Sequence, residues 1–395
     1  MAKLKMFEIS FSNMNGVFYA GTILHGHVTV GLNRSMQLRG ITLRFKGRAD
    51  VKWSETTGTG DDSRTDHFSA KEVYFKQYSL LFGKFSTQGG NDIRLAEGRH
   101  DFPFQFQIPH GVPSSFEGSH GHIKYTVKCT IGRAWKFDHT IKRPFTIISI
   151  LDLNLQPNCL ERIERSDQKQ ISCLFWTSGS IKARFYVNRA GYVPGEAIKL
   201  FAEIRNDSDL RMNKSYVALK MEITYRAKKK LKTEIKEVAR VTRPRIEPHE
   251  HDQWNGEQLV IPPLPPSFLA GCGIIDIKYI LQLNVDPSGL FHDLKVPLEI
   301  LIGTIPLVSV AQRHPPMPQL PPAGVDNWNN PSTPSRRPDY PPTGLTDIPP
   351  PSYDSVIRHE QGDNEYATGN MDATISTHYN WRHTPGASPN QTGKR

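Results

Sequence analysis

The chain has 395 residues, enough for two or three domains, and a formal net charge of +10 at pH 7. It contains no run of about eighteen apolar residues, so we expect no transmembrane helix. Its four cysteines include no C-x-x-C pair, which favours a reducing compartment over a disulfide framework. We expect neither a signal peptide nor a terminal lipidation, because the charged first residues precede no apolar run and position 2 is alanine.

The excess of positive charge predicts attraction to anionic partners, such as phosphorylated peptides or the inner membrane leaflet. Nucleic acid is not expected as a partner, because no recognition motif accompanies the charge. Catalytic signatures such as H-E-x-x-H, G-x-S-x-G and the phosphate-binding Gly-Lys loop are also missing. We therefore predict no catalytic residue, no cofactor and no metal. His249-Glu250-His251-Asp252 has metal-ligand chemistry, but without further ligands at suitable spacing we interpret it as a polar loop between strands.

Alternating apolar and polar residues predict β-strands throughout the first half of the chain. Ile41, Leu43 and Phe45 alternate with polar side chains, and the same period of two recurs over residues 102–108 and 123–131. Pro103 has no backbone N–H to donate, so its strand is expected to lie at a sheet edge or to carry a bulge. Residues 54–70, rich in serine, threonine and glycine, are expected to form a mobile polar loop.

The second half repeats both this alternation and the landmarks of the first half. An Ile-Pro pair, a proline-serine-phenylalanine turn, a glycine and an Ile-Lys-Tyr strand follow one another over residues 108–125, and again over residues 261–279. We interpret the halves as two copies of one β-sandwich. The predicted fold is all-β, with two tandem immunoglobulin-like sandwiches over residues 1–151 and 171–310 and a linker over residues 152–170.

Residues 311–395 are expected to form a disordered tail. Proline, asparagine, serine, threonine and glycine dominate this segment, so it cannot bury enough apolar area to offset the entropy of ordering. The tail contains one P-P-x-Y motif, formed by Pro350, Pro351 and Tyr353. Consecutive prolines favour a polyproline II helix, which WW domains bind in an aromatic groove. Chance occurrence in a proline-rich tail is the alternative.

A basic run, Arg226-Ala227-Lys228-Lys229-Lys230-Leu231-Lys232, is expected to lie at the top of a hairpin in the second domain. One interpretation is a solvated loop. The other is contact with anionic lipid or a phosphorylated receptor tail through its lysines, at about 1 kcal/mol per basic residue near a membrane. Its candidate residues are Lys228, Lys229, Lys230 and Lys232. Polar faces of strands in the first domain offer similar candidates, namely Arg44, Lys46, Lys124 and Lys128.

The whole arrangement resembles the alpha-arrestins, the arrestin domain-containing proteins, and within them the branch of thioredoxin-interacting protein. The motifs that carry the resemblance lie over about residues 7–310 and include Tyr19-x-Gly21, Phe104-x-Phe106-x-Ile108-Pro109, Pro113-Ser114-Ser115-Phe116, Gly191-Tyr192-x-Pro194-Gly195-Glu196 and Ile302-Gly303-Thr304-Ile305-Pro306. The resemblance implies arrestin-type sandwiches and an adaptor rather than an enzyme. Such adaptors bind membrane receptors or transporters as cargo, and work in the cytoplasm with peripheral recruitment to the plasma membrane and endosomes.

The resemblance also implies that Pro350, Pro351 and Tyr353 recruit WW-domain HECT ubiquitin ligases of the Nedd class. Cargo would then be ubiquitinated, internalised and sorted at endosomes. Many relatives carry two P-P-x-Y motifs, which can engage two WW domains together. A single motif loses this avidity, which can raise the affinity about 10²–10⁴-fold. Two alternatives stay open: a ligase-independent trafficking or signalling scaffold, and a redox enzyme using Cys272. No cation flanks Cys272, so a buried structural thiol is the preferred interpretation.

Overall fold

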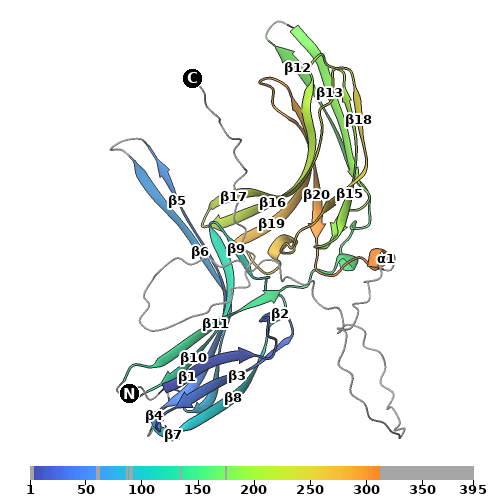
Figure 1. Cartoon of the computed structure of the whole chain (residues 1–395). Helices are drawn as coiled ribbons and strands as arrows, with labels where there is room; N and C mark the ends of the chain where they lie inside the picture. Colours follow the sequence, from blue (N-terminus) through green and yellow to red (C-terminus); the bar gives the residue numbers. More distant parts are fainter. Residues whose placement is uncertain are drawn as a thin grey trace, which may run out of the picture.

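The computed structural model describes residues 4–58, 63–85, 88, 92–133, 136–173 and 176–311, and these form an almost entirely β structure (Figure 1). The tail and its P-P-x-Y motif lie outside the described residues. No described helix has the length and apolar content needed to cross a membrane. Short helical turns occur at η2 (Leu153–Leu155), η3 (Ser267–Leu269) and α1 (Val308–Ala311).

The first half folds into two facing sheets with strand orders β1-β3-β8 and β2-β11-β10-β5-β6, with β9 on β10 and a small β4-β7 pair beside them. The strands are β1 (Leu4–Phe11), β2 (Val17–Tyr19), β3 (Ile23–Leu32), β4 (Met36–Leu38), β5 (Gly40–Thr57), β6 (Arg64–Gly83), β7 (Ile93–Leu95), β8 (Gly98–Gln107), β9 (Phe116–Gly118), β10 (Gly121–Gly132) and β11 (His139–Ile148). Strand β8 is an edge, which confirms the expectation from Pro103.

The core of the first sandwich follows from the predicted alternation. Strand β10 buries every second residue from Gly121 to Ile131, and β5 does so over most of its length. Across the sandwich the rings of Phe45 and Phe106 stack with centroids 4.3 Å apart. The alternate residues of β5 and β10 face outward, so this sheet presents one polar face.

Residues 54–70 differ from the expectation of a loop. Strands β5 and β6 pair continuously as far as Thr57 and Arg64, and in Figure 1 their hairpin extends well beyond the body of the sheet. Two contacts explain the extension: Trp53 stacks on Phe68 with centroids 5.3 Å apart, and Thr56 and Thr65 share a hydroxyl hydrogen bond of 3.1 Å. The loop expectation was therefore wrong for residues 54–57 and 64–70.

The second half forms a second sandwich, with strand orders β12-β13-β15-β18 and β14-β20-β19-β16-β17. The strands are β12 (Ile163–Cys173), β13 (Trp176–Val187), β14 (Gly191–Tyr192), β15 (Ala197–Asn206), β16 (Met212–Ala227), β17 (Lys230–Arg243), β18 (His251–Val260), β19 (Ile275–Pro287) and β20 (Leu294–Ile302). Strand β12 begins at Ile163, so hydrogen-bonded structure of this sandwich starts inside the range 152–170 expected to form the linker.

Matched hydrogen bonds confirm that the halves are copies of one fold. The Tyr125 hydroxyl donates to the Pro113 carbonyl at 2.6 Å, and the Tyr279 hydroxyl donates to the Pro265 carbonyl at 2.7 Å. Both tyrosines are buried in the Ile-Lys-Tyr strands. A parallel strand pair also recurs, β2 with β11 and β14 with β20. The repeated landmarks in the sequence therefore mark the same structural positions.

Candidate functional site

The two sandwiches contact each other through loops and hairpins, and this junction positions the candidate basic run. The Ser119 hydroxyl of the first domain donates to Glu234 on β17 at 2.8 Å. Beside it, the rings of His120 and Tyr225 meet edge to face at 5.4 Å. Figure 1 shows the β16–β17 hairpin lying against the β9 end of the first sandwich. The hairpin is thus held at one end by the other domain.

The basic run occupies the tip of this hairpin, as the sequence predicted. Lys228 and Lys229 form the turn between β16 and β17, with Lys228 in the left-handed region at φ 55°. Lys228, Lys229 and Lys230 are exposed, whereas Lys232 is half-buried opposite Tyr225. Within the described part of the chain, these lysines make no ion pair. The tip therefore presents unneutralised positive charge next to the domain junction.

The charge at the tip acts on the neighbouring junction. The pKa of His120 lies below its usual value, mainly because the ring is partly buried and next because Lys232 is close. The imidazole is therefore biased towards its neutral form near neutral pH. This bias fits its packing against Tyr225, since a neutral ring costs less to bury.

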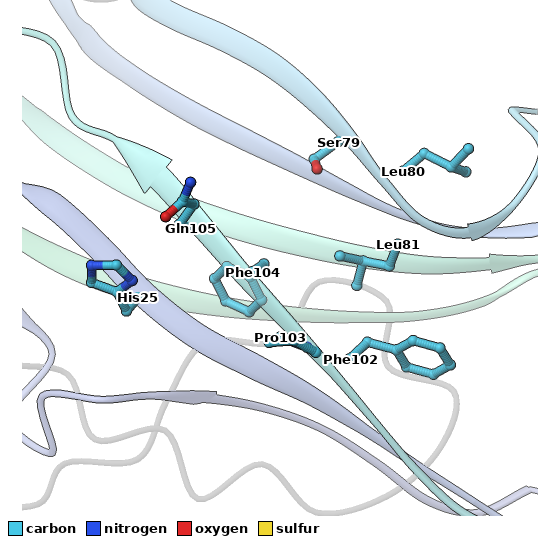
Figure 2. Close-up of a pocket in the computed structure, with 8 residues that line it drawn as sticks. All are labelled: His25, Ser79, Leu80, Leu81, Phe102, Pro103, Phe104 and Gln105. Atoms are coloured by element: carbon cyan, nitrogen blue, oxygen red, sulfur yellow. The ribbon is translucent and has the colours of Figure 1, made fainter.

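An open groove lies between the edge strands of the first sandwich, and Figure 2 shows its lining side chains. The groove has a volume of about 560 Å³. Its lining is His25, Ser79, Leu80, Leu81, Phe102, Pro103, Phe104 and Gln105. Of these residues His25 is the single titratable one, so the groove offers no pair of groups for acid–base chemistry. Its apolar walls suit packing contacts rather than a reaction.

Cys272 lies at the domain junction, half-buried beside Tyr74 of β6. Burial is the largest influence on its thiol and raises its pKa. The sulfur accepts a hydrogen bond from the Ile275 amide at 3.3 Å. Cys129 is fully buried, and burial raises its pKa to about 12. Both thiols are thus held protonated, as expected for structural cysteines.

The His249–Asp252 segment does not assemble a metal site. His249 sits in a turn at φ 60°, where its Nε2 lies 3.1 Å from Asp209, while Asp252 pairs with Arg243 at 2.7 Å. Across the described ranges no three His, Cys, Asp or Glu side chains come together as ligands. His249 and Glu250 lie in the turn that precedes β18, whereas His251 and Asp252 already belong to this strand, so the expected loop covers only the first half of the segment.

Glu72 is a junction residue that sequence reasoning missed. Its carboxylate accepts hydrogen bonds from the backbone amide of Gly273, which lies 201 positions later in the chain. No local pattern around either residue signals this contact.

Pro350, Pro351 and Tyr353, the predicted WW-binding residues, lie outside the described residues.

Comparison with known proteins agrees with the two-sandwich architecture. Residues 7–154 match the N-terminal domain of arrestin (or S-antigen), and residues 177–307 match its C-terminal domain. The chain is 33% identical to arrestin domain-containing protein 4 of Homo sapiens over 304 residues, which cover 76% of this chain and 71% of that protein. It is 29% identical to arrestin domain-containing protein 17 of Caenorhabditis elegans over 327 residues, covering 80% and 74%. It is also 29% identical to arrestin domain-containing protein 1 of Homo sapiens over 326 residues, covering 82% and 69%. The chain therefore belongs to the alpha-arrestin family of arrestin domain-containing proteins.

Proposed function

We propose that this protein is an adaptor that joins membrane cargo to WW-domain ubiquitin ligases of the HECT type, in the Nedd class. The arrestin body binds receptors or transporters, and Pro350, Pro351 and Tyr353 dock the ligase. Cargo is then ubiquitinated, endocytosed and sorted at endosomes. Membership of the alpha-arrestin family supports the adaptor role. The P-P-x-Y motif in the sequence is the observation that supports the proposed recruitment of the ligase.

The motif suits WW binding for a physical reason. Three successive prolines, Pro349 to Pro351, restrict the backbone before a partner binds, so less entropy is lost on docking. The prolines fill an aromatic groove while the ring of Tyr353 occupies a second pocket. A single motif binds one WW domain at a time, so body contacts with cargo or membrane would have to add to recruitment.

The protein is proposed to act in the cytoplasm and to reach the plasma membrane and endosomes peripherally. The exposed lysines at the β16–β17 tip support a contact with anionic lipid, because each is worth about 1 kcal/mol at such a surface. Replacing Lys228, Lys229 and Lys230 by glutamine should weaken binding to phosphatidylserine vesicles by about 3 kcal/mol. Unchanged vesicle binding would favour the solvated-loop interpretation of this tip.

The experiment that tests ligase recruitment is binding of the full chain to a panel of WW domains. Tyr353→Ala should abolish binding, because it removes the side chain that fills the second pocket. Tyr340→Ala is the matched control, since Tyr340 also lies among prolines of the tail but in the order P-D-Y-P-P. Absence of binding by the wild-type chain would leave a ligase-independent trafficking or signalling scaffold as the leading function.

A further inference from the structure

The first sandwich is open along the side where β6 and β8 end their sheets. Strand β6 is last in one sheet and β8 is last in the facing sheet, and neither has a strand beside its outer edge within the described part of the chain. The groove of about 560 Å³ lies between these two edges, and Figure 2 shows Leu81 of β6 and Phe104 of β8 among its lining side chains. The outer backbone N–H and C=O groups of an edge strand are free to pair with another strand.

Gln77 and Ser79 of β6 show that the core lacks a cover at this edge. They are the cross-strand partners of Phe45 and Leu43, so all four side chains lie on the face of the sheet that is turned to the core. Phe45 and Leu43 are buried, whereas Gln77 is exposed and Ser79 is half-buried. Two polar residues therefore occupy positions that the register assigns to the core.

The second sandwich, a copy of the same fold, is closed at the matching edge. When the two Ile-Lys-Tyr strands are aligned, the strand pairings match Gln77 to Ala239 and Ser79 to Val241, both on β17. Ala239 and Val241 are apolar, partly buried and packed against the core. The polar residues on β6 are thus a property of the first domain and not a requirement of the fold.

Ion pairs also join the two edges of the second sandwich. Arg243 of β17 pairs with Asp252 of β18 at 2.7 Å and with Glu257 of the same strand. Within the ranges that the structure describes, no ion pair joins β6 to β8. These strands meet through the rings of Phe82 and Phe102, whose centroids are 5.8 Å apart. The matching edge of the first sandwich is therefore left available to a further segment.

The tail contains a segment with the pattern of a strand that has one apolar face. Over residues 371–382, the odd positions hold apolar and aromatic residues with one threonine, and every even position is polar. Neither proline nor glycine interrupts the alternation. The residues on the apolar face are Met371, Ala373, Ile375, Thr377, Tyr379 and Trp381. A single strand cannot bury such a face by itself, so the segment needs a sheet to pair with.

From these features we propose that residues 371–382 add to the outer edge of β6 as a strand of the same chain. Main-chain hydrogen bonds to the free edge would hold the segment, as in other cases of strand addition. Its apolar face would then cover the groove and pack on Leu81, Phe102 and Phe104. Its polar face would be turned to water, as the even positions of the pattern require.

The chemistry of the groove suits the two large rings of the segment. Tyr379 and Trp381 bring much apolar area, but a buried tyrosine hydroxyl or indole N–H needs a hydrogen-bond partner. The groove combines apolar walls with polar side chains, among them Ser79 and Gln105. The polar residues that left the edge open would thus satisfy the polar ends of the rings.

The chain is long enough for this contact. A flexible coil of the length of residues 312–370 spans roughly 40–45 Å, whereas a small domain is about 30 Å across. Attachment to the same chain also raises the effective concentration of the segment, up to about the millimolar range. Weak strand addition is therefore sufficient, which favours the protein's own tail over a separate peptide as the occupant.

Docking of the segment would place the P-P-x-Y motif close to the first sandwich. A coil of the length of residues 354–370, which separate Tyr353 from the segment, spans roughly 20–25 Å. A ligase bound at Tyr353 would thus be kept near this domain instead of at the end of a long tether. This consequence rests on the proposed function, whereas docking of residues 371–382 does not.

Hydrogen exchange of the full chain, read by mass spectrometry, tests the docking. Peptides that cover residues 371–382 and residues 76–81 of β6 should both be protected in the wild-type chain. The variant Tyr379→Ala, Trp381→Ala removes the rings expected to fill the groove. Both regions should exchange about tenfold faster in this variant, because the docked state is then rarely populated.

The matched control is the variant Trp328→Ala, Tyr366→Ala. It removes the same two residue types from the tail, but from positions outside the alternating segment. Its exchange at residues 371–382 and at β6 should equal that of the wild type. Both tail variants leave the sequence of the two sandwiches unchanged, so a difference between them reports on the segment and not on folding.

A change on the groove side should give the same result. Gln77→Lys together with Ser79→Lys puts two charges on the core-facing side of β6, and inward-pointing charges block strand addition. Protection of residues 371–382 should be lost about tenfold, as in the tail variant. The control His67→Lys, Ser69→Lys adds the same charge at exposed positions farther along β6 and should keep the protection. Circular dichroism checks the folding of both variants.

Three results would overturn the docking: residues 371–382 unprotected in the wild-type chain, equal exchange in a variant and its control, or protection that falls on dilution. The last result would assign the edge of β6 to the tail of a second copy. WW-domain binding is measured in parallel, and all four variants should bind as the wild type does. Loss of protection with intact Tyr353-dependent binding would refute the docking alone. Protection without WW binding would instead count against the proposed function.

Discussion

Glu72 in the first sandwich accepts hydrogen bonds from the backbone amide of Gly273 in the second, at 3.0 Å to Oε2 and 3.2 Å to Oε1. The segment just before Gly273 is conformationally demanding, because Phe268 and Leu269 both have positive φ, at 69° and 37°. A charged acceptor on β6 thus holds a strained loop of the other domain. The contact therefore fixes this loop of the second domain against β6 of the first domain.

Replacing Glu72 by glutamine should loosen the loop. The amide side chain keeps one acceptor oxygen but loses the negative charge, which weakens the hydrogen bond by about 1 kcal/mol. Hydrogen exchange at the Gly273 amide should accelerate about fivefold. Glu97→Gln, at an exposed position before β8, is the control and should leave this amide unchanged. An unchanged exchange rate in Glu72→Gln would mean that the contact does not protect the loop.

Removing the tyrosine hydroxyl at either matched position should destabilise the domain that contains it. Tyr125→Phe leaves the buried Pro113 carbonyl without its 2.6 Å partner, and Tyr279→Phe does the same to Pro265. An unsatisfied buried acceptor costs about 1–3 kcal/mol. Urea unfolding, followed by hydrogen exchange in each sandwich, should show a loss of stability in the substituted one. Tyr216→Phe, whose hydroxyl is only partly buried beside Asp293, should cost less.

Gly47→Ala should destabilise the first sandwich. An added Cβ would lie 2.5 Å from the Tyr125 ring and 2.8 Å from the Phe75 ring, which are packed against each other with centroids 5.6 Å apart. Overpacking of this kind costs about 1–3 kcal/mol. Gly132→Ala on β10 is the matched control, because its nearest neighbour would lie 3.7 Å away. Equal melting temperatures for the two variants would contradict the packing described for Gly47.

Alkylation of Cys272 should be slow in the native protein. Burial raises the pKa of its thiol, so the reactive thiolate is scarce at pH 8. Peptide mass spectrometry after a short iodoacetamide pulse should show labelling at least about tenfold slower than in urea-unfolded chain. Cys272→Ser confirms the assignment of the labelled peptide. A native rate that equals or exceeds the unfolded rate would revive the redox interpretation of this cysteine.

Much of the fold could be predicted because its signals are local. The period of two over residues 123–131 places one face of β10 in the core, and the repeated Ile-Lys-Tyr strand predicts a second sandwich before any contact is known. The P-P-x-Y motif is local as well. Residues 54–70 were wrongly predicted to form a loop, because serine, threonine and glycine are typical of loops. The strand pairing found there depends on the contact of Trp53 with Phe68 across the hairpin, which the local composition does not show.

The sequence by itself determined which residues face the core, where the copies repeat, and that Arg44, Lys46 and Lys128 lie on polar strand faces. Only the tertiary structure decided which of them become neighbours. Cross-strand register brings Lys142 beside Lys128, and docking of the domains brings Glu72 to Gly273. Alternation is encoded by residues next to each other in the chain, whereas register and docking depend on pairings between distant segments, which no short motif records.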